Sequence, residues 1–243
     1  MLLRRAVLAL APALAFGAIA APAFAQPANP RVVINTAQGS ITLELFADKA
    51  PITTANFLKY VDRKLYDGAT FYRASKPKGQ TSNDYGTIQG GLQNDPKKVL
   101  PPIAHESTTK TGLKHTDGTI SMGRHAPGSA QADWFICIGD MSYLDATPKD
   151  PGFAAFGRVV DGMDVAKTIL GLPVDPNAGV GAMKGEMLVK PLRISSIRRA
   201  PPAPPSNPPS VPPPSPAAPA PPAAQPSATP PSPPAAAPTP GAA

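Results

Sequence analysis

Short runs of alternating apolar and polar residues fill the middle of this chain, from residue 31 to residue 199. Within the run at 40–46, Ile41, Leu43 and Leu45 alternate with other residues and would form one apolar face of a strand. The runs are rich in β-branched and aromatic residues, and turn-forming residues separate them. The pattern predicts strands at residues 31–35, 40–46, 69–73, 86–89, 118–122, 134–138, 154–160 and 191–197.

Two other segments have the spacing of helices. In the first, apolar residues recur at helical intervals between Phe57 and Leu65, after a candidate N-cap at Thr53 or Thr54. The second covers residues 162–170. Many short strands with two isolated helices indicate a mainly β fold, either an antiparallel barrel or a sandwich capped by helices.

The first 25 residues have the organisation of a cleaved secretory signal. Arg4 and Arg5 precede a long apolar run, and residues 23–25 give the small-x-small pattern of a cleavage site. A retained membrane anchor is the alternative, but proline and glycine interrupt the run. We expect residues 26–30 to begin the mature chain as a short N-terminal segment. The protein is then secreted across the inner membrane into the periplasm, by the Sec or the twin-arginine route, with no membrane attachment afterwards.

The composition changes abruptly after Arg199. Residues 201–243 contain 20 prolines among 43 residues, and alanine, serine and threonine make up most of the rest. Such a segment has few apolar side chains whose burial would offset its conformational entropy. We expect residues 200–243 to form a disordered Pro/Ala-rich tail, which acts as a spacer or binds a proline-reading partner. The globular part, residues 31–199, has the size of a single domain.

Charge, cysteine and histidine each exclude a class of function. The formal net charge of +7 becomes +5 without the two arginines of the signal segment, and the basic residues are scattered, so we expect no nucleic-acid binding. The single cysteine, Cys137, lies in a predicted strand and is expected to be a buried, inert thiol. His105, His115 and His125 are ten residues apart, which matches neither a helix face nor a strand face. We therefore expect no metal and no other cofactor.

Several segments, taken together and in order, resemble the cyclophilins. The signatures are SITLELFADKAPITTANFLKYV, GATFYR, IQGG, GTISMGR, WFICIGD, SYLD and FAAFGRVVDGMDVAKTI. The likeness runs through nearly all of residues 31–199. It implies an eight-stranded antiparallel β-barrel closed by two α-helices. It also implies peptidyl-prolyl cis-trans isomerase activity on proline-containing polypeptides, and we expect a monomer.

The resemblance also implies the residues of the active site. Arg73 would be the catalytic guanidinium, Gln89 its polar neighbour and Phe135 the floor of the proline pocket. Further substrate contacts would come from Met122, Gly123, Arg124, Tyr143, Leu144 and Phe153. The apolar members of this set also fit ordinary core positions, so the assignment depends on their joint match to the family.

The chain departs from the family around this pocket. The loop between the arginine and glutamine signatures is longer, and Gly86 and Thr87 stand where the family usually has a Phe-Met pair that lines the pocket. Tyr85 or Ile88 would be the replacement, and Asp133 stands where an amide is common. A weakened isomerase that binds proline-containing chains as a chaperone or adaptor is therefore the main alternative.

Overall fold

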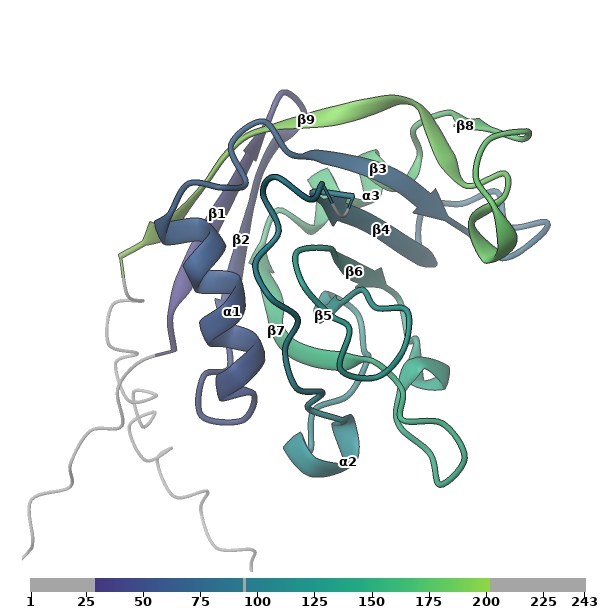
Figure 1. Cartoon of the computed structure of the whole chain (residues 1–243). Helices are drawn as coiled ribbons and strands as arrows, with labels where there is room; N and C mark the ends of the chain where they lie inside the picture. The colour runs from purple at the N-terminus through teal and green to yellow at the C-terminus, as the bar shows by residue number, and fades with distance from the viewer. Residues whose placement is uncertain (1–28, 94, 202–243) are drawn as a thin grey trace, which may run out of the picture. The chain divides into compact units, whose positions relative to one another are not determined.

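The computed structural model describes residues 29–93 and 95–201, which belong to one compact unit (Figure 1). The predicted signal segment, residues 1–25, and the predicted tail beyond residue 201 lie outside the described residues. Across the described ranges, no helix has the length and apolar character needed to cross a membrane.

All the predicted strands are present, with small changes at their ends. They are β1 (Arg31–Thr36), β2 (Gly39–Leu45), β3 (Thr70–Ser75), β4 (Gly86–Gly91), β5 (Thr119–Met122), β6 (Trp134–Ile138), β7 (Ala154–Asp161) and β9 (Met187–Ala200). A two-residue strand, β8 (Val174–Asp175), was not predicted and pairs with the beginning of β9. β9 is longer than predicted because it pairs with β3 in its first part and with β1 in its last part, up to Ala200.

Eight of these strands close into a barrel. Their order is β1-β2-β7-β5-β6-β4-β3-β9, and β9 pairs back onto β1, with every pairing antiparallel. Val32 on β1 lies opposite both Leu43 on β2 and Arg199 on β9, and it is fully buried. Closure leaves these strands without a free edge, so the prediction of a mainly β barrel is confirmed and the sandwich is excluded.

Aromatic side chains fill the interior of the barrel. Trp134 on β6 is fully buried and lies edge-on to Phe57, Tyr66 and Phe71, with ring centroids 6.2, 6.4 and 5.2 Å away. Edge-to-face contacts of this kind stabilise a core by more than the burial of the aromatic surface alone. Cys137 is also buried, as predicted, and burial raises the pKa of its thiol.

In the part of the chain that the structure describes, three α-helices accompany the strands: α1 (Pro51–Asp62), α2 (Thr108–Thr111) and α3 (Met163–Leu170). The two predicted helices pack on the barrel, α1 against β7 and β9, and α3 against β2, β3, β4 and β6. α2 is a single turn that the spacing of apolar residues did not predict. Two 3₁₀ turns, η1 (Ser142–Leu144) and η2 (Gly181–Met183), carry residues of the site described below.

The predicted N-cap of α1 was wrong, and the helix ends before Leu65. Ala50 is the N-cap residue, with Pro51 in the first turn, so Thr53 and Thr54 lie inside the helix. At the other end the helix stops at Asp62, because Lys64 adopts a left-handed conformation with φ of 57°.

Candidate active site

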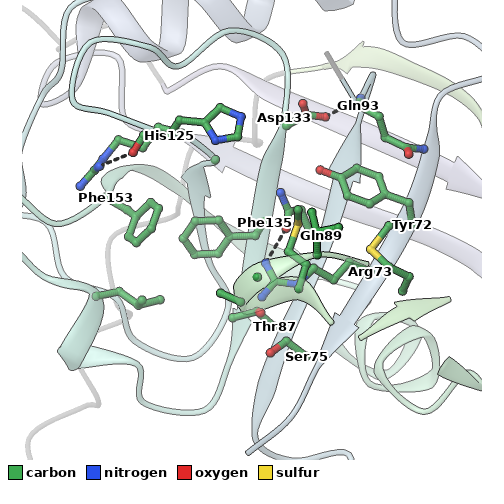
Figure 2. A pocket seen from close by; sticks show the side chains of 18 of the residues that line it. Tyr72, Arg73, Ser75, Thr87, Gln89, Gln93, His125, Asp133, Phe135 and Phe153 are labelled. Atoms are coloured by element: carbon green, nitrogen blue, oxygen red, sulfur yellow. Dashed lines mark hydrogen bonds between the residues drawn. The ribbon is translucent and has the colours of Figure 1, made fainter. Parts of the chain in front are cut away.

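A cavity of about 790 Å³ opens beside β3, β4 and β6. Figure 2 shows Arg73, Gln89 and Phe135 close together among the side chains that line it. The structure brings together nearly all of the predicted site residues in the lining: Arg73, Gln89, Gly123, Arg124, Phe135, Tyr143, Leu144 and Phe153. Met122 is not in the lining: it is 1% exposed and packs in the barrel core.

Arg73 is positioned by the pairing of β3 with both of its neighbours. It lies opposite Gln89 on β4 and Met187 on β9, just after an irregularity in both pairings that follows Phe71. Its Nη1 donates a hydrogen bond of 2.8 Å to Oε1 of Gln89 (Figure 2). The predicted neighbour relation between Arg73 and Gln89 is therefore confirmed as a direct contact.

A carboxylate that the sequence analysis did not single out holds the other edge of the guanidinium. Nε and Nη2 of Arg73 both donate to Oε2 of Glu186, at 2.8 and 2.6 Å. Ser75 donates to the second oxygen, Oε1, at 2.7 Å. The side chains of Arg73 and Glu186 are only 21% and 24% exposed, so the pair is largely shielded from solvent.

Phe135 supplies the apolar floor. It lies on β6 opposite Gln89 and is 7% exposed, with its ring edge-on to Phe153 at 5.4 Å and 90° (Figure 2). Phe135, Cys137 and Met141 form a small buried cluster, the Phe135 cluster, and Leu144 packs against it. An apolar ring-sized surface therefore lies within the same cavity as a fixed guanidinium.

The side chain of Arg124 supports this wall. Its guanidinium lies 4.8 Å from the centroid of the Phe153 ring, and its Nε donates to the carbonyl oxygen of Gly152 at 2.9 Å. Nη2 donates to the same oxygen. Arg124 therefore holds the loop that carries Phe153, a role that the sequence did not indicate.

The other two predicted contacts, Gly123 and Tyr143, differ in how accessible they are to a substrate. The backbone N–H of Gly123 already donates to the carbonyl oxygen of Asp133 at 2.8 Å, so that N–H is not available to a substrate. Tyr143 is 69% exposed at the rim of the cavity. It is therefore placed to contact a bound chain outside the floor made by Phe135.

A buried polar array lies behind Phe135. The imidazole of His115 stacks on the Phe135 ring, with centroids 6.1 Å apart. Its Nδ1 is 2.8 Å from Oδ1 of Asp145, and its Nε2 is 2.9 Å from Oγ of Ser121. Because a carboxylate only accepts, Nδ1 donates to Asp145 and a neutral ring accepts from Ser121. Burial lowers the pKa of His115, although the Asp145 carboxylate opposes this shift.

The three histidines have separate surroundings. His115 is buried as described, Nε2 of His105 is 2.9 Å from the carbonyl oxygen of Pro151, and His125 lines the cavity. Within residues 29–93 and 95–201, no group of three histidine, cysteine or acidic side chains has the arrangement of a metal site.

The absence of a large side chain at Gly86 has a steric reason. A Cβ atom there would collide with the carbonyl oxygen of Ser75 and crowd the side chain of Leu170 on α3. Ile88 is fully buried, and Tyr85 packs on the Phe135 cluster, so neither lines the cavity as a replacement. Thr87 does line it.

The apolar wall on the Arg73 side comes instead from a segment that the sequence analysis overlooked. Val180, Met183 and Met187, from the stretch between β8 and the start of β9, all line the cavity. In the sequence, the only available signal was a cluster of methionine and glycine just before the last strand, at residues 181–187. Tyr72 and Asp133 also line the cavity, and burial together with the Asp133 charge raises the pKa of Tyr72.

The closed antiparallel barrel carries a guanidinium, an amide and a phenyl ring in one cleft. The family model described as cyclophilin type peptidyl-prolyl cis-trans isomerase/CLD matches residues 31–198. The chain belongs to this family of isomerases, as the sequence resemblance had predicted.

Relatives with assigned names agree with this family. The chain is 31% identical to a peptidyl-prolyl cis-trans isomerase of Acinetobacter baylyi, over 70% of this chain and 86% of that protein. It is 36% identical to another of Streptomyces antibioticus, over 69% of this chain and 96% of that protein. A crystal structure of a cyclophilin type isomerase from Cryptosporidium parvum has a TM-score of 0.57 at 22% identity, covering 74% and 99% of the two chains, and supports the fold.

Proposed function

We propose that Arg73 is the catalytic residue of this isomerase and that its substrates are X–Pro bonds of exported or unfolded polypeptides. Rotation about such a bond is slow because amide resonance opposes it with a barrier of roughly 18–20 kcal/mol. No covalent bond has to break, so the site needs only to bind the twisted amide more tightly than the planar one.

The fixed guanidinium is the observation that supports this proposal. Three of its N–H groups donate to Gln89 and Glu186, and within the described chain its two remaining N–H groups have no hydrogen-bond acceptor. In the twisted amide the prolyl nitrogen regains its lone pair, which then accepts a hydrogen bond from a cation better than a planar amide nitrogen does. Phe135 would hold the proline ring next to that donor, in the cavity that both residues line.

The place of action is part of the same proposal. The signal-like residues 1–25 support export across the inner membrane, and the periplasm of a two-membrane cell is the compartment we propose. Unfolded exported chains would present their X–Pro bonds to the cleft there. Fusion of residues 1–25 to a reporter that is active only outside the inner membrane tests this placement, and a cytoplasmic reporter would contradict it.

The catalytic role is tested by measuring X–Pro exchange in a peptide by NMR with the purified protein and two Arg73 variants. Arg73→Ala is expected to lower kcat/KM by about 30- to 1000-fold, because a charge-assisted hydrogen bond specific to the transition state is lost. Arg73→Lys should recover little, since a single ammonium group cannot replace the planar fork.

Peptide affinity separates this function from its alternative. With the catalytic role correct, Arg73→Ala binds the peptide nearly as well as the wild type and fails only in exchange. Wild-type exchange in Arg73→Ala would contradict the proposed role. Peptide binding without measurable exchange in the wild-type protein would favour the binding module, which the missing side chain at Gly86 supports.

A further inference from the structure

Glu186 reaches Arg73 from a part of the chain that is fixed to β3 by its backbone. The carbonyl oxygen of Glu186 accepts from the N–H of Ala74 at 3.0 Å, and the N–H of Glu186 donates to the carbonyl oxygen of Met183 at 3.2 Å. The side chain then lies between Arg73 and Ser75, with one carboxylate oxygen for each. Glu186 is therefore held at both its backbone and its carboxylate.

The geometry of the contact decides which edge of the guanidinium faces the cavity. Nε and Nη2 of Arg73 share one oxygen of Glu186, while Nη1 is bonded to Gln89. An arginine side chain held at two edges loses most of its rotamer freedom before the substrate arrives. The two remaining N–H groups, one on Nη1 and one on Nη2, are then fixed in direction before a substrate binds.

We infer that Glu186 is a positioning residue that orients Arg73 for catalysis, with Ser75 as its anchor. This inference rests on the proposed catalytic role of Arg73. Glu186 does not line the cavity, so its effect passes through the guanidinium and not through contact with the substrate. The carboxylate also balances the charge of Arg73 in a cleft wall of low exposure.

The kinetic test compares Glu186→Ala and Glu186→Gln with the wild-type protein. Glu186→Ala is expected to lower kcat by about 10-fold with KM changed less than about 2-fold, because a guanidinium out of position costs rate and not binding. Glu186→Gln keeps an oxygen that accepts from Nε and Nη2, so it should stay within about 3-fold of the wild type. An equal loss in both variants would overturn the inference, because charge and not position would then be responsible.

Asp62→Ala is the matched control. It removes another bidentate partner of an arginine, Arg199, at distances of 2.7 and 2.8 Å, and Asp62 does not line the cavity. Its kcat should equal that of the wild type. If Glu186→Ala does not fold, Ser75→Ala takes its place, with an expected smaller loss of kcat, and an unchanged kcat in that variant would count against the inference.

A spectroscopic readout separates this inference from the proposed function. The Nε–H of Arg73, observed by ¹⁵N NMR, should exchange slowly with water in the wild type and in Glu186→Gln, and rapidly in Glu186→Ala. Equal exchange rates would overturn the positioning role even if Arg73→Ala is inactive. Activity retained by Arg73→Ala would refute the catalytic role of Arg73 while the exchange rates still decide whether Glu186 orders it.

Discussion

His115 is fully buried, yet it supports the ring that forms the floor of the proposed proline pocket. Its imidazole stacks on Phe135 and is fixed by Asp145 on one side and Ser121 on the other. The order Ser-His-Asp is also that of hydrolase triads, but Ser121 is fully buried and has no access to a substrate. At this position the array is part of the packing of the pocket floor.

A pH dependence follows from the burial of this histidine. Burial lowers the pKa of His115 from its usual 6.5, so below that value the unfolded chain binds a proton that the folded chain resists. The contribution of neutral His115 to the free energy of unfolding is complete above about pH 6.5, and it is lost as the pH falls through the lower pKa of the folded state. The ammonium group of Lys114, 3.4 Å from the Asp145 carboxylate, also lowers the pKa of His115. Burial raises the pKa of Asp145, but the contacts with His115 lower it overall, so Asp145 titrates at lower pH.

Urea unfolding between pH 7.5 and 5 checks this prediction. The wild-type protein should lose free energy of unfolding across that range, and His115→Gln, although less stable at pH 7.5, should lose less of it. Parallel profiles of the two proteins would show that His115 does not titrate in this window.

At the scale of elements, α1 begins without a side-chain cap of its own. Ala50 offers no side-chain acceptor, and the carboxylate of Glu106 accepts instead from the backbone N–H groups of Ile52 and Thr53 at 3.2 and 2.8 Å. The hydroxyl of Thr53 also donates to Glu106, at 2.7 Å. A negative charge at a helix N-terminus satisfies free N–H groups and interacts favourably with the helix dipole.

Glu106→Ala is expected to lower the free energy of unfolding by about 1–2 kcal/mol, the usual cost of losing a cap. For a domain of this size the melting temperature should fall by about 2–8 °C, measured by circular dichroism. Glu106→Gln keeps the acceptor oxygen and should lose clearly less. If Glu106→Ala melts like the wild type, the distant carboxylate does not stabilise α1.

At the scale of the whole molecule, the barrel depends on the pairing of the first strand with the last. Ile34 on β1 lies opposite Ile197 on β9, and both are fully buried. Beyond Ile197, Arg198 forms a bidentate pair with Asp67 at 2.7 Å for both contacts. The last residues of β9 therefore stabilise the closed barrel through a buried contact in its interior and through a partly exposed ion pair.

Two truncations test this closure against the predicted tail. A chain ending at Pro201 should melt within about 1 °C of the full chain, because residues 202–243 have few apolar side chains to bury. A chain ending at Ser195 loses Ile197 and the pairing that closes the ring, and it should not give a cooperative melting transition. A loss of several degrees on ending the chain at Pro201 would show that the tail contributes to the folded state.

The alternation of apolar residues and the turn residues between them determined by themselves where the strands lie. These signals are local, because a side chain's face along a strand depends only on its own position and its neighbours. The ordered signatures also placed Arg73, Gln89 and Phe135 in one site. The start of α1 was predicted less well, because the residue that caps it, Glu106, lies elsewhere in the chain.

Only the tertiary structure decided how the guanidinium is held and what walls the cavity. Arg73 and Glu186 are 113 residues apart and meet because β3 pairs with β9, and no sequence periodicity encodes that pairing. The same pairing brings Met187 to the cavity. Sequence motifs identify the residues proposed to perform the chemistry, whereas strand pairing across the closed barrel selects the residue that we infer to orient them.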